Sequence, residues 1–595
     1  MNQRISCAAL LALWTPFASA SDSVAVSAPI VVTATRTAEI ADETLPPVIV
    51  ITREDIARSQ ATDVADLLRF HAGLEIARNG GPGQTTSLFL RGTDSNHTLV
   101  LVDGVKINPG TIGGAALQHI NPEIIERIEI VKGPRSTLYG SEAIGGVVNI
   151  ITRSETQGTR AELAYGQGKY DTRTASLDLR QRRDDFRSGI TVSGLRSDGF
   201  PPRDGSDLDR GHDNTTINAY LGSRLGPIDA EVSLWRAAGN TEYLDFFLNP
   251  VDQDFENRVA ALTFEANPSV AWTSLLRLSH TIDEIDQNQS DDFAHTRRYL
   301  VDFQNDIQIG AHQLLSAGLW LSREDTAASV FGSTFDEDTA VNAAYLQDDL
   351  DLGRHRLLLA ARVTDHDSFG THTTWDVEYG YQWGERTRLT AAAGTAFRAP
   401  DATDRFGFGG NPDLDPETAR NLEVGLRHTA GHHRFTASAF RNDIDDLIES
   451  VEIEPDTFIM QNIGKARITG LELAYRFARG PWQLRTELSF QDPENRDTGD
   501  RLLRRATRNF TANLRYERPR YSMSLDLLAA GDRKDFSGDL DSYELLNATL
   551  SLRPLPSWEA RLKIENLLDQ DYQLARTYNT SERAWFLELR YRHRG

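Results

Sequence analysis

Hydrophobic and polar residues alternate with a period of two along most of the chain from about residue 156 to its end. The segment 374–383 reads TWDVEYGYQW, and segments 174–180, 510–516 and 558–564 repeat this pattern. Because successive side chains of a strand point to opposite faces, each segment has one apolar and one polar face. The pattern predicts about 22 strands, each long enough to cross a membrane at a tilt.

The connections between these segments are of two kinds. Some are tight, at 225–227 and 431–432, and others are long and acidic, at 198–213, 283–295 and 492–501. Aromatic residues lie toward the ends of the apolar faces, where lipid-facing strands meet the membrane interface. Short turns on one side and long loops on the other are typical of outer-membrane barrels. We therefore predict a transmembrane β-barrel of about 22 antiparallel strands over residues 156–595.

Residues 21–155 have a different pattern. Val64, Leu67 and Leu68 recur at helical spacing and predict a helix over 59–71, which Gly73 ends. Apolar runs at 98–102, 124–131 and 145–151 predict strands. A barrel of this width leaves an open lumen, and a small α/β unit could fill it. We expect residues 41–155 to form an N-terminal plug domain inside the barrel.

Composition narrows the classes of protein further. Charged residues make up 25% of the chain, the formal net charge is −23, and mean hydropathy is −0.42. The absence of an apolar run near 18 residues excludes a helical membrane bundle, and the acidity argues against a nucleic-acid partner. The chain contains none of the motifs GxSxG, HExxH or GxxxxGK[ST], so we expect no enzymatic activity.

Residues 1–20 have the layout of a secretory signal peptide. Arg4 precedes an apolar stretch at 8–14, and Ala18-Ser19-Ala20 is a small-residue cleavage site. The single cysteine, Cys7, lies within this segment. We expect an exported protein that uses no disulfides.

Several longer motifs carry a resemblance to a known family. They are SLFLRGTDSNHTLVLVDGVKINPG (87–110), IERIEIVKGPRSTLYGSEAIGGVVNIITR (125–153), FRAP (397–400) and NIGKARITGLE (462–472). The sequence resembles the TonB-dependent outer-membrane receptors and, within them, the cobalamin (vitamin B12) transporters. The resemblance implies a protein embedded in outer-membrane lipid, driven by TonB from the periplasm and carrying a corrinoid ligand. It also implies insertion by the barrel-assembly machinery, although His593 stands where the family usually has an aromatic residue.

The N-terminal stretch APIVVTATR contains the expected contact with TonB. Its β-branched residues favour an extended strand, which a partner could capture by strand addition. The resemblance implies that residues 21–40 form a periplasmic segment with a TonB box of Ile30, Val31, Val32, Thr33 and Ala34. The alternative is an ordinary first strand of the plug.

Two glycine-rich stretches of the plug resemble substrate-contacting loops. The resemblance implies contacts from Asn79, Gln84, Thr85, Ile112 and Gly113. Amide side chains both donate and accept hydrogen bonds, which suits a corrin ring edged with amides. The alternative is that these residues only form turns.

Acidic residues cluster in two neighbouring long connections of the barrel. The resemblance implies that calcium orders these loops through Asp207, Asp209, Asp213, Tyr243, Asp245 and Asp254. Calcium prefers six to eight oxygen ligands, which carboxylates supply. The alternative is a set of solvated surface acids.

Charged residues of the plug resemble those that pair with the barrel wall. The set comprises Arg91, Arg127, Arg135, Arg153, Glu126, Glu129 and Glu142. The predicted function is TonB-dependent transport of cobalamin or a related corrinoid, with a ferric-siderophore or other iron-chelate receptor as the alternative. A passive porin or an adhesin would need neither a plug nor a TonB box.

Overall fold

A computed structural model describes residues 30–154, 157–454 and 457–594. The predicted signal peptide lies outside these described residues. Among them, no helix has the length and apolar character needed to cross a membrane.

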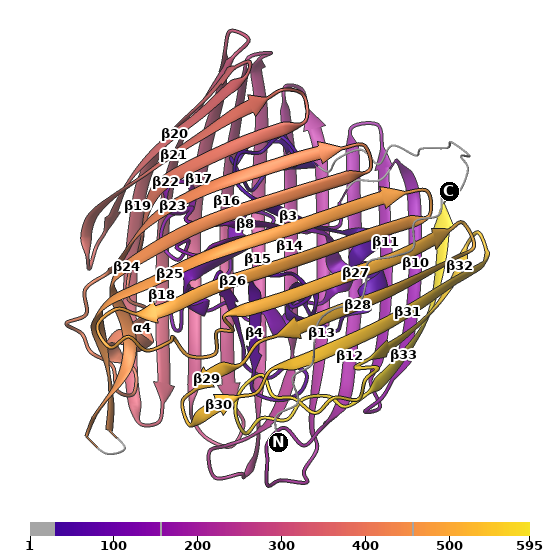
Figure 1. The fold of residues 1–595 in the computed structure, drawn as a ribbon, viewed down its shortest axis with the longest axis vertical. Coiled ribbons are helices and arrows are strands. Elements are labelled where there is room, and N and C mark those ends of the chain that lie inside the picture. The colour runs from indigo at the N-terminus through magenta and orange to yellow at the C-terminus, as the bar shows by residue number, and fades with distance from the viewer. Residues whose placement is uncertain (1–29, 155–156, 455–456, 595) are drawn as a thin grey trace, which may run out of the picture.

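A closed antiparallel barrel of 22 strands forms the larger part of the molecule, as predicted (Figure 1). Each strand pairs with its neighbour in sequence, and β33 closes the ring by pairing with β10. The strands are β10 Gly158–Gly168, β11 Arg173–Arg183, β12 Phe186–Phe200, β13 Arg210–Leu225, β14 Ile228–Leu244, β15 Pro250–Ser269, β16 Trp272–Gln287, β17 Phe293–Ile309, β18 Gln313–Val330, β19 Ser333–Leu352, β20 His355–His366, β21 Gly370–Trp383, β22 Thr387–Arg398, β23 Glu417–Ala430, β24 His433–Glu454, β25 Thr457–Arg479, β26 Trp482–Asn495, β27 Arg508–Arg518, β28 Tyr521–Ala530, β31 Tyr543–Leu555, β32 Trp558–Glu565 and β33 Ala584–Arg594.

Many strands are longer than a membrane requires. β24 and β25 have 22 and 23 residues, whereas a tilted membrane strand needs about 9–11. Two of the long connections are correspondingly shorter than predicted, at 201–209 and 288–292, whereas the third, at 496–507, is slightly longer and begins later than predicted. The hairpins continue beyond the membrane because the cross-strand ladder also forms in water, with outward ion pairs such as Arg297–Glu284 at 2.7 Å.

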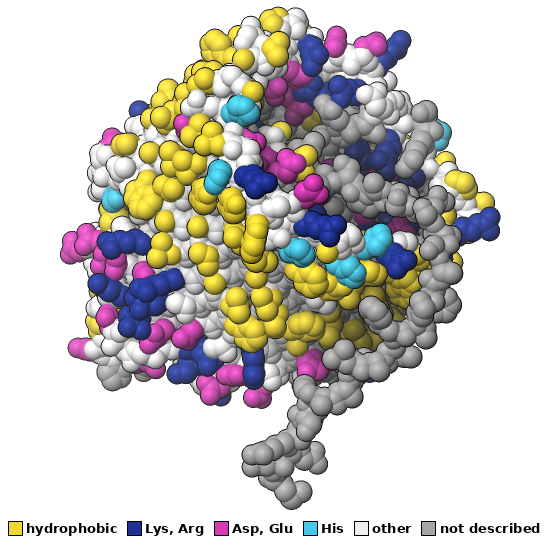
Figure 2. All heavy atoms as spheres, turned by 45° about the horizontal axis from the view of Figure 1, so that its top comes forward, with side chains coloured by type: hydrophobic (Ala, Val, Ile, Leu, Met, Phe, Trp, Pro, Cys, Tyr) yellow, Lys and Arg dark blue, Asp and Glu magenta, His cyan; other side chains and the backbone are white. Residues whose placement is uncertain are grey.

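The alternation predicted from sequence separates lipid-facing from inward side chains. On β10, Leu163 and Tyr165 are more than half exposed, while the intervening Ala164 points inward. Hydrophobic side chains spread over the outer surface of the barrel in Figure 2, and charged ones lie at its lower left and toward its top right.

The plug lies inside the barrel, between its two walls (Figure 1). Its main sheet has the order β3-β8-β9-β6-β7, and only β6 and β9 pair in parallel. The predicted strands at 98–102, 124–131 and 145–151 are confirmed as β6, β8 and β9. The plug elements are β1 Ile30–Val31, β2 Glu39–Ile40, β3 Val48–Thr52, α1 Arg53–Ser59, α2 Val64–Leu68, β4 Leu74–Arg78, β5 Thr86–Leu90, η1 Ser95–His97, β6 Thr98–Val102, β7 Val105–Lys106, η2 Leu117–His119, η3 Pro122–Ile124, β8 Ile125–Lys132, α3 Ser136–Tyr139 and β9 Gly146–Thr152.

The predicted helix over 59–71 is wrong in its extent. Only α2 forms within this range, over Val64–Leu68, and α1 is a separate helix that ends at Ser59. Thr52 and Asp55 form a capping box at α1, and the Asp63 side chain accepts a hydrogen bond from the Asp66 amide at α2.

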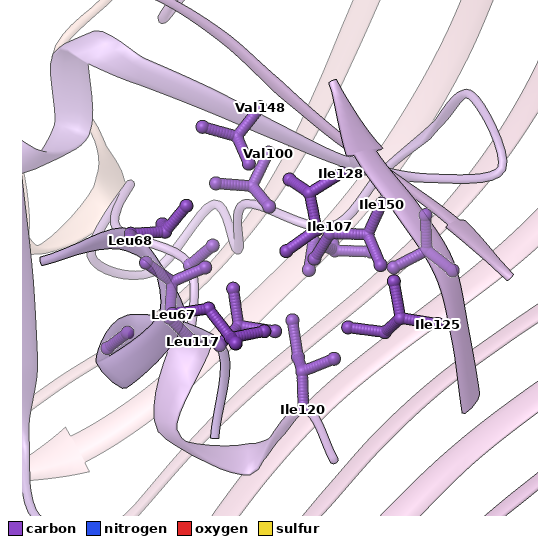
Figure 3. Close-up of a cluster of buried hydrophobic side chains, with 14 of the residues drawn as sticks. Leu67, Leu68, Val100, Ile107, Leu117, Ile120, Ile125, Ile128, Val148 and Ile150 are labelled. Atoms are coloured by element: carbon purple, nitrogen blue, oxygen red, sulfur yellow. The ribbon is translucent and has the colours of Figure 1, made fainter. Parts of the chain in front are cut away.

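The plug has its own hydrophobic core. Leu67 and Leu68 of α2 pack toward Val100, Ile128 and Ile150 of the sheet (Figure 3). The plug is thus a folded domain, held in the lumen by a separate set of contacts.

Candidate functional site

The segment predicted to be the TonB box is folded against the plug. β1 pairs with β2, placing Val31 opposite Glu39, and Val31, Thr33 and Ala34 are buried. This differs from the free periplasmic segment expected from sequence. One carboxylate oxygen of Glu129 accepts hydrogen bonds from the Val32 amide (2.9 Å), the Thr33 amide (2.9 Å) and the Thr33 hydroxyl (2.6 Å).

Further contacts hold Thr33 and the residues after it. The Tyr139 hydroxyl donates to the Thr33 carbonyl and the Asn149 amide donates to the Thr33 hydroxyl, each at 3.0 Å. Arg36 forms an ion pair with Asp302 of β17, a strand of the barrel wall. A strand-addition partner needs free backbone groups, so such a partner could bind this segment only after the segment detaches from the plug.

The first predicted substrate loop, residues 79–85, joins β4 to β5 and packs against the wall. A Cβ added at Gly80 would lie 2.6 Å from Pro202, and one at Gly83 would lie 2.1 Å from His212. The side-chain amide of Gln84 is buried and donates to the Glu242 carbonyl at 2.6 Å. Close approach to the barrel thus accounts for these glycines, and Thr85 is the exposed residue of the loop.

The second predicted substrate loop lies beneath a loop of the barrel. The amides of Ala402 and Thr403, at the start of α4 (Ala402–Phe406), donate to the carbonyls of Gly110 and Thr111 at 2.9 Å. Gly113 adopts φ +66° and is buried. Ile112 stays 51% exposed, so Thr85 and Ile112 are the predicted contacts best placed to meet a ligand, while Asn79 is half-buried.

A buried ionic network beneath α4 was not assigned from sequence. Arg398 donates to Asp404 at 2.9 Å and to Glu417 at 2.5 Å, and Glu417 contacts His97 of the plug at 2.7 Å. The network ties the loop 399–416 to both β23 and the plug. The FRAP motif (397–400) contains Arg398, but the motif alone did not indicate the role of this residue in the network.

The six residues predicted to bind calcium do not converge in this structure. Asp213 lies opposite Asn240, whose side chain donates to Asp254 at 2.8 Å. Asp245 accepts hydrogen bonds from two amides of its own loop, and Tyr243 donates to Gln287 at 2.6 Å. Asp207 and Asp209 are exposed in the loop 201–209. Within the described residues, no three His, Cys, Asp or Glu side chains are placed to share an ion.

Ion pairs between the plug and the wall confirm part of the prediction. Arg91 pairs with Glu423 at 2.8 Å, Arg135 pairs with Glu378, and Arg153 pairs with Glu162 at 3.1 Å. Glu126 approaches Arg180 of β11 at 3.9 Å. The prediction is wrong for three residues, which pair within the plug as Arg127–Glu129 and Lys106–Glu142.

A cavity of about 170 Å³ separates the plug from one sector of the wall. Phe200 and Tyr572 line it near the long loops, and Arg58 and Arg485 line it deeper in the lumen. In the part of the chain that the structure describes, no hydrogen bond or ion pair joins the plug to β28 or β31, the strands behind this cavity, and the plug reaches them through the apolar side chain of Phe70. The plug is therefore attached unevenly around its circumference.

These features define a class: a β-barrel pore closed by an internal plug domain. Comparisons with known proteins identify the family. Residues 157–567 match the family model described as "TonB dependent receptor-like, beta-barrel", and residues 41–147 match the "TonB-dependent Receptor Plug Domain". The chain belongs to the TonB-dependent receptors, which are outer-membrane proteins.

Individual relatives agree with this assignment. The chain is 31% identical over 620 residues to the vitamin B12 transporter BtuB of Vibrio vulnificus, with both chains covered completely. A mutant of the ferric enterobactin receptor PfeA of Pseudomonas aeruginosa superposes with a TM-score of 0.82 at 18% identity, covering 95% of this chain and 100% of that one. The siderophore receptor PirA of Acinetobacter baumannii gives 0.79 at 18% identity, covering 92% and 98%. At such identity the two structures establish the fold alone.

Proposed function

We propose that this TonB-dependent receptor carries cobalamin or a related corrinoid across the outer membrane. The observation that carries the proposal is the 31% identity to a vitamin B12 transporter over the complete length of both chains. Ligand would bind at the mouth of the barrel near Thr85 and Ile112, and TonB would then capture residues 30–34.

The charge of the mouth supports a corrinoid over the alternative, a ferric siderophore. Acidic residues outnumber basic ones in the loops 201–209, 245–249, 288–292 and 399–416, and only 496–507 has the opposite balance. A tris-catecholate iron complex is strongly anionic, so an acidic rim would slow its approach. A cobalamin without excess negative charge would not be repelled by the acidic rim.

Binding of cyanocobalamin to the purified protein tests the substrate. We expect saturable binding in the micromolar range or tighter, together with weak binding of ferric enterobactin. The proposal fails if cyanocobalamin does not bind up to tens of micromolar while a ferric siderophore does.

Calcium is a further part of the proposal, through Asp207, Asp209, Asp213, Tyr243, Asp245 and Asp254. Asp207, Asp209 and Asp245, in the loops 201–209 and 245–249, would have to come together with Asp213, Tyr243 and Asp254 of the adjoining strands β13, β14 and β15. We expect millimolar calcium to tighten cyanocobalamin binding and to protect both loops from protease, whereas magnesium, which demands a stricter octahedral geometry, should do so less. If Asp209→Asn with Asp245→Asn leaves the calcium effect intact, the assigned ligands are wrong.

TonB coupling is tested by Val32→Pro. Proline removes the Val32 amide and its strand pairing with a partner, so we expect normal ligand binding but loss of energy-dependent uptake. The control is Ala38→Pro, which lies just outside the TonB box. Val48→Pro is unsuitable as a control because it breaks the plug sheet. Uptake that survives in Val32→Pro would contradict the assignment of residues 30–34.

A further inference from the structure

An apolar groove runs over the outside of the barrel, across strands β14–β19. Its cavity measures about 800 Å³. Outward-facing Leu262, Leu278, Val301 and Leu321 line it, and the small residues Ala260 and Ala340 leave it open. The groove faces away from the plug and belongs to neither the ligand path nor the TonB box.

The position of the groove relative to the membrane follows from β17. Its outward side chains are apolar or aromatic over most of the stretch from Tyr299 to Ile309, which ends at a short turn. At roughly 3.3 Å per residue and ~45° tilt this stretch spans about 23 Å, the height of a barrel's apolar band. Tyr299 therefore marks the edge of the band on the side of the long loops, at the outer leaflet.

Three side chains with donor groups meet at this edge. His280, Tyr299 and Arg323 are direct neighbours across β16, β17 and β18. The Tyr299 ring is 59% exposed and stacks on His280 with ring centroids 4.4 Å apart. The buried Nε2 of His280 has no hydrogen-bond partner, and among the described residues no hydrogen bond or ion pair is found for the exposed Arg323.

Other charges nearby already have partners. Arg258 approaches Glu256 at 3.5 Å, and Arg297 pairs with Glu284 at 2.7 Å. Asp325 and Asp338 face each other one step closer to the loops. Arg323 thus stands out as an unpaired cation at the boundary between polar and apolar surface.

We propose that this groove is a specific binding site for one molecule of the phosphorylated saccharolipid of the outer leaflet. A lipid phosphate would bind Arg323, with the Tyr299 hydroxyl as a further donor and the stacked His280 ring fixing the position of the Tyr299 ring. Acyl chains would lie between Leu262, Leu278, Val301 and Leu321. The charge complementarity and the position at the outer leaflet distinguish this site from ordinary lipid contact.

Native mass spectrometry of the full chain in mild detergent tests the proposal, with titrated bisphosphorylated lipid A as the probe. We expect one lipid A to be retained by the wild type and its apparent affinity to fall at least ~10-fold in Arg323→Ala. The matched control is Arg441→Ala, an outward arginine of β24 whose side chain pairs with Asp443 at 2.6 Å. It should retain lipid A like the wild type.

A second variant and a folding measurement complete the test. Ala260→Phe fills the groove without touching Arg323 and should also weaken the binding of lipid A. Heat-modifiable gel migration verifies that the barrel of each variant is folded. Equal retention of lipid A by Arg323→Ala, or equal loss in Arg441→Ala, would overturn the site. Phosphatidylglycerol binding as tightly as lipid A would overturn the choice of lipid.

Discussion

Glu129 links the interior of the plug to residues 32–33, which belong to the proposed TonB box. Its carboxylate lies in β8 and is fully buried, with Arg127 paired to one oxygen at 2.7 Å and Val32 and Thr33 hydrogen-bonded to the other. Hydrogen bonds to a charged acceptor are worth about 1.5–3 kcal/mol each. The side chain predicted to face the barrel wall therefore serves to retain residues 32–33.

Replacing this charge should release the segment. In Glu129→Gln the hydrogen bonds of Val32 and Thr33 lose their charged acceptor, and we expect the ligand-free protein to bind the periplasmic domain of TonB about 10-fold more tightly. Titration calorimetry with the isolated TonB domain measures this. Glu126→Gln on the same strand, with a partly exposed side chain, should have no effect, and equal affinities of all three proteins would exclude a retaining role for Glu129.

The short helix η2 shows how one element anchors the plug to the wall. Its His119 stacks on Phe255 of β15 with centroids 3.6 Å apart, and its Nδ1 lies 2.8 Å from the Asn257 side chain. Burial lowers the pKa of His119 to about 4, from about 6.5, because charging the ring would cost its hydration. The sequence placed Ile112 and Gly113 in a loop of the plug, but it assigned no role to His119.

This pKa predicts a pH-dependent attachment. The folded state holds His119 neutral, so its contribution is complete above about pH 6.5 and is lost progressively as pH falls toward 4. We expect hydrogen exchange of residues 117–120, corrected for intrinsic rates, to accelerate over that range. His119→Gln should flatten the response, and an unchanged pH profile in that variant would assign the effect to other groups.

At the scale of elements, the sequence predicted strands better than it predicted the helix. Alternation over 174–180, 374–383, 510–516 and 558–564 corresponds to β11, β21, β27 and β32, because the period of two is a local property of an extended chain. The helix predicted over 59–71 is reduced to α2, because the cap at Asp63 sets its start and the separate helix α1 ends at Ser59.

At the scale of the whole molecule, the plug is a folded domain inside a wide pore. It is fixed by many polar contacts, among them Arg91, Arg135 and Arg153, and it borders a cavity at β28 and β31. When the plug separates from the wall, polar contacts can be replaced by contacts with water one at a time. An apolar interface would instead expose its whole area to water at once. Such an attachment suits a plug that must move and return.

Removing the plug should convert the receptor into an open pore. A chain lacking residues 41–155 keeps the strands β10–β33, and a barrel of this size encloses a water-filled lumen. We expect steady single-channel conductance in planar bilayers for this variant and almost none for the full chain. Equal conductance of the two proteins would mean that the plug does not close the lumen.

The sequence alone determined the barrel, the presence of a plug and the family, since periodicity and long motifs are properties of neighbouring residues. It also marked Arg91, Arg135 and Arg153 as partners of the wall. Only the tertiary structure decided that Glu129 holds Thr33, that Gln84 binds the wall, and that Arg398 joins α4 to His97. Each of these contacts joins segments far apart in sequence, and a buried charge takes whichever partner the closed barrel brings within hydrogen-bonding distance.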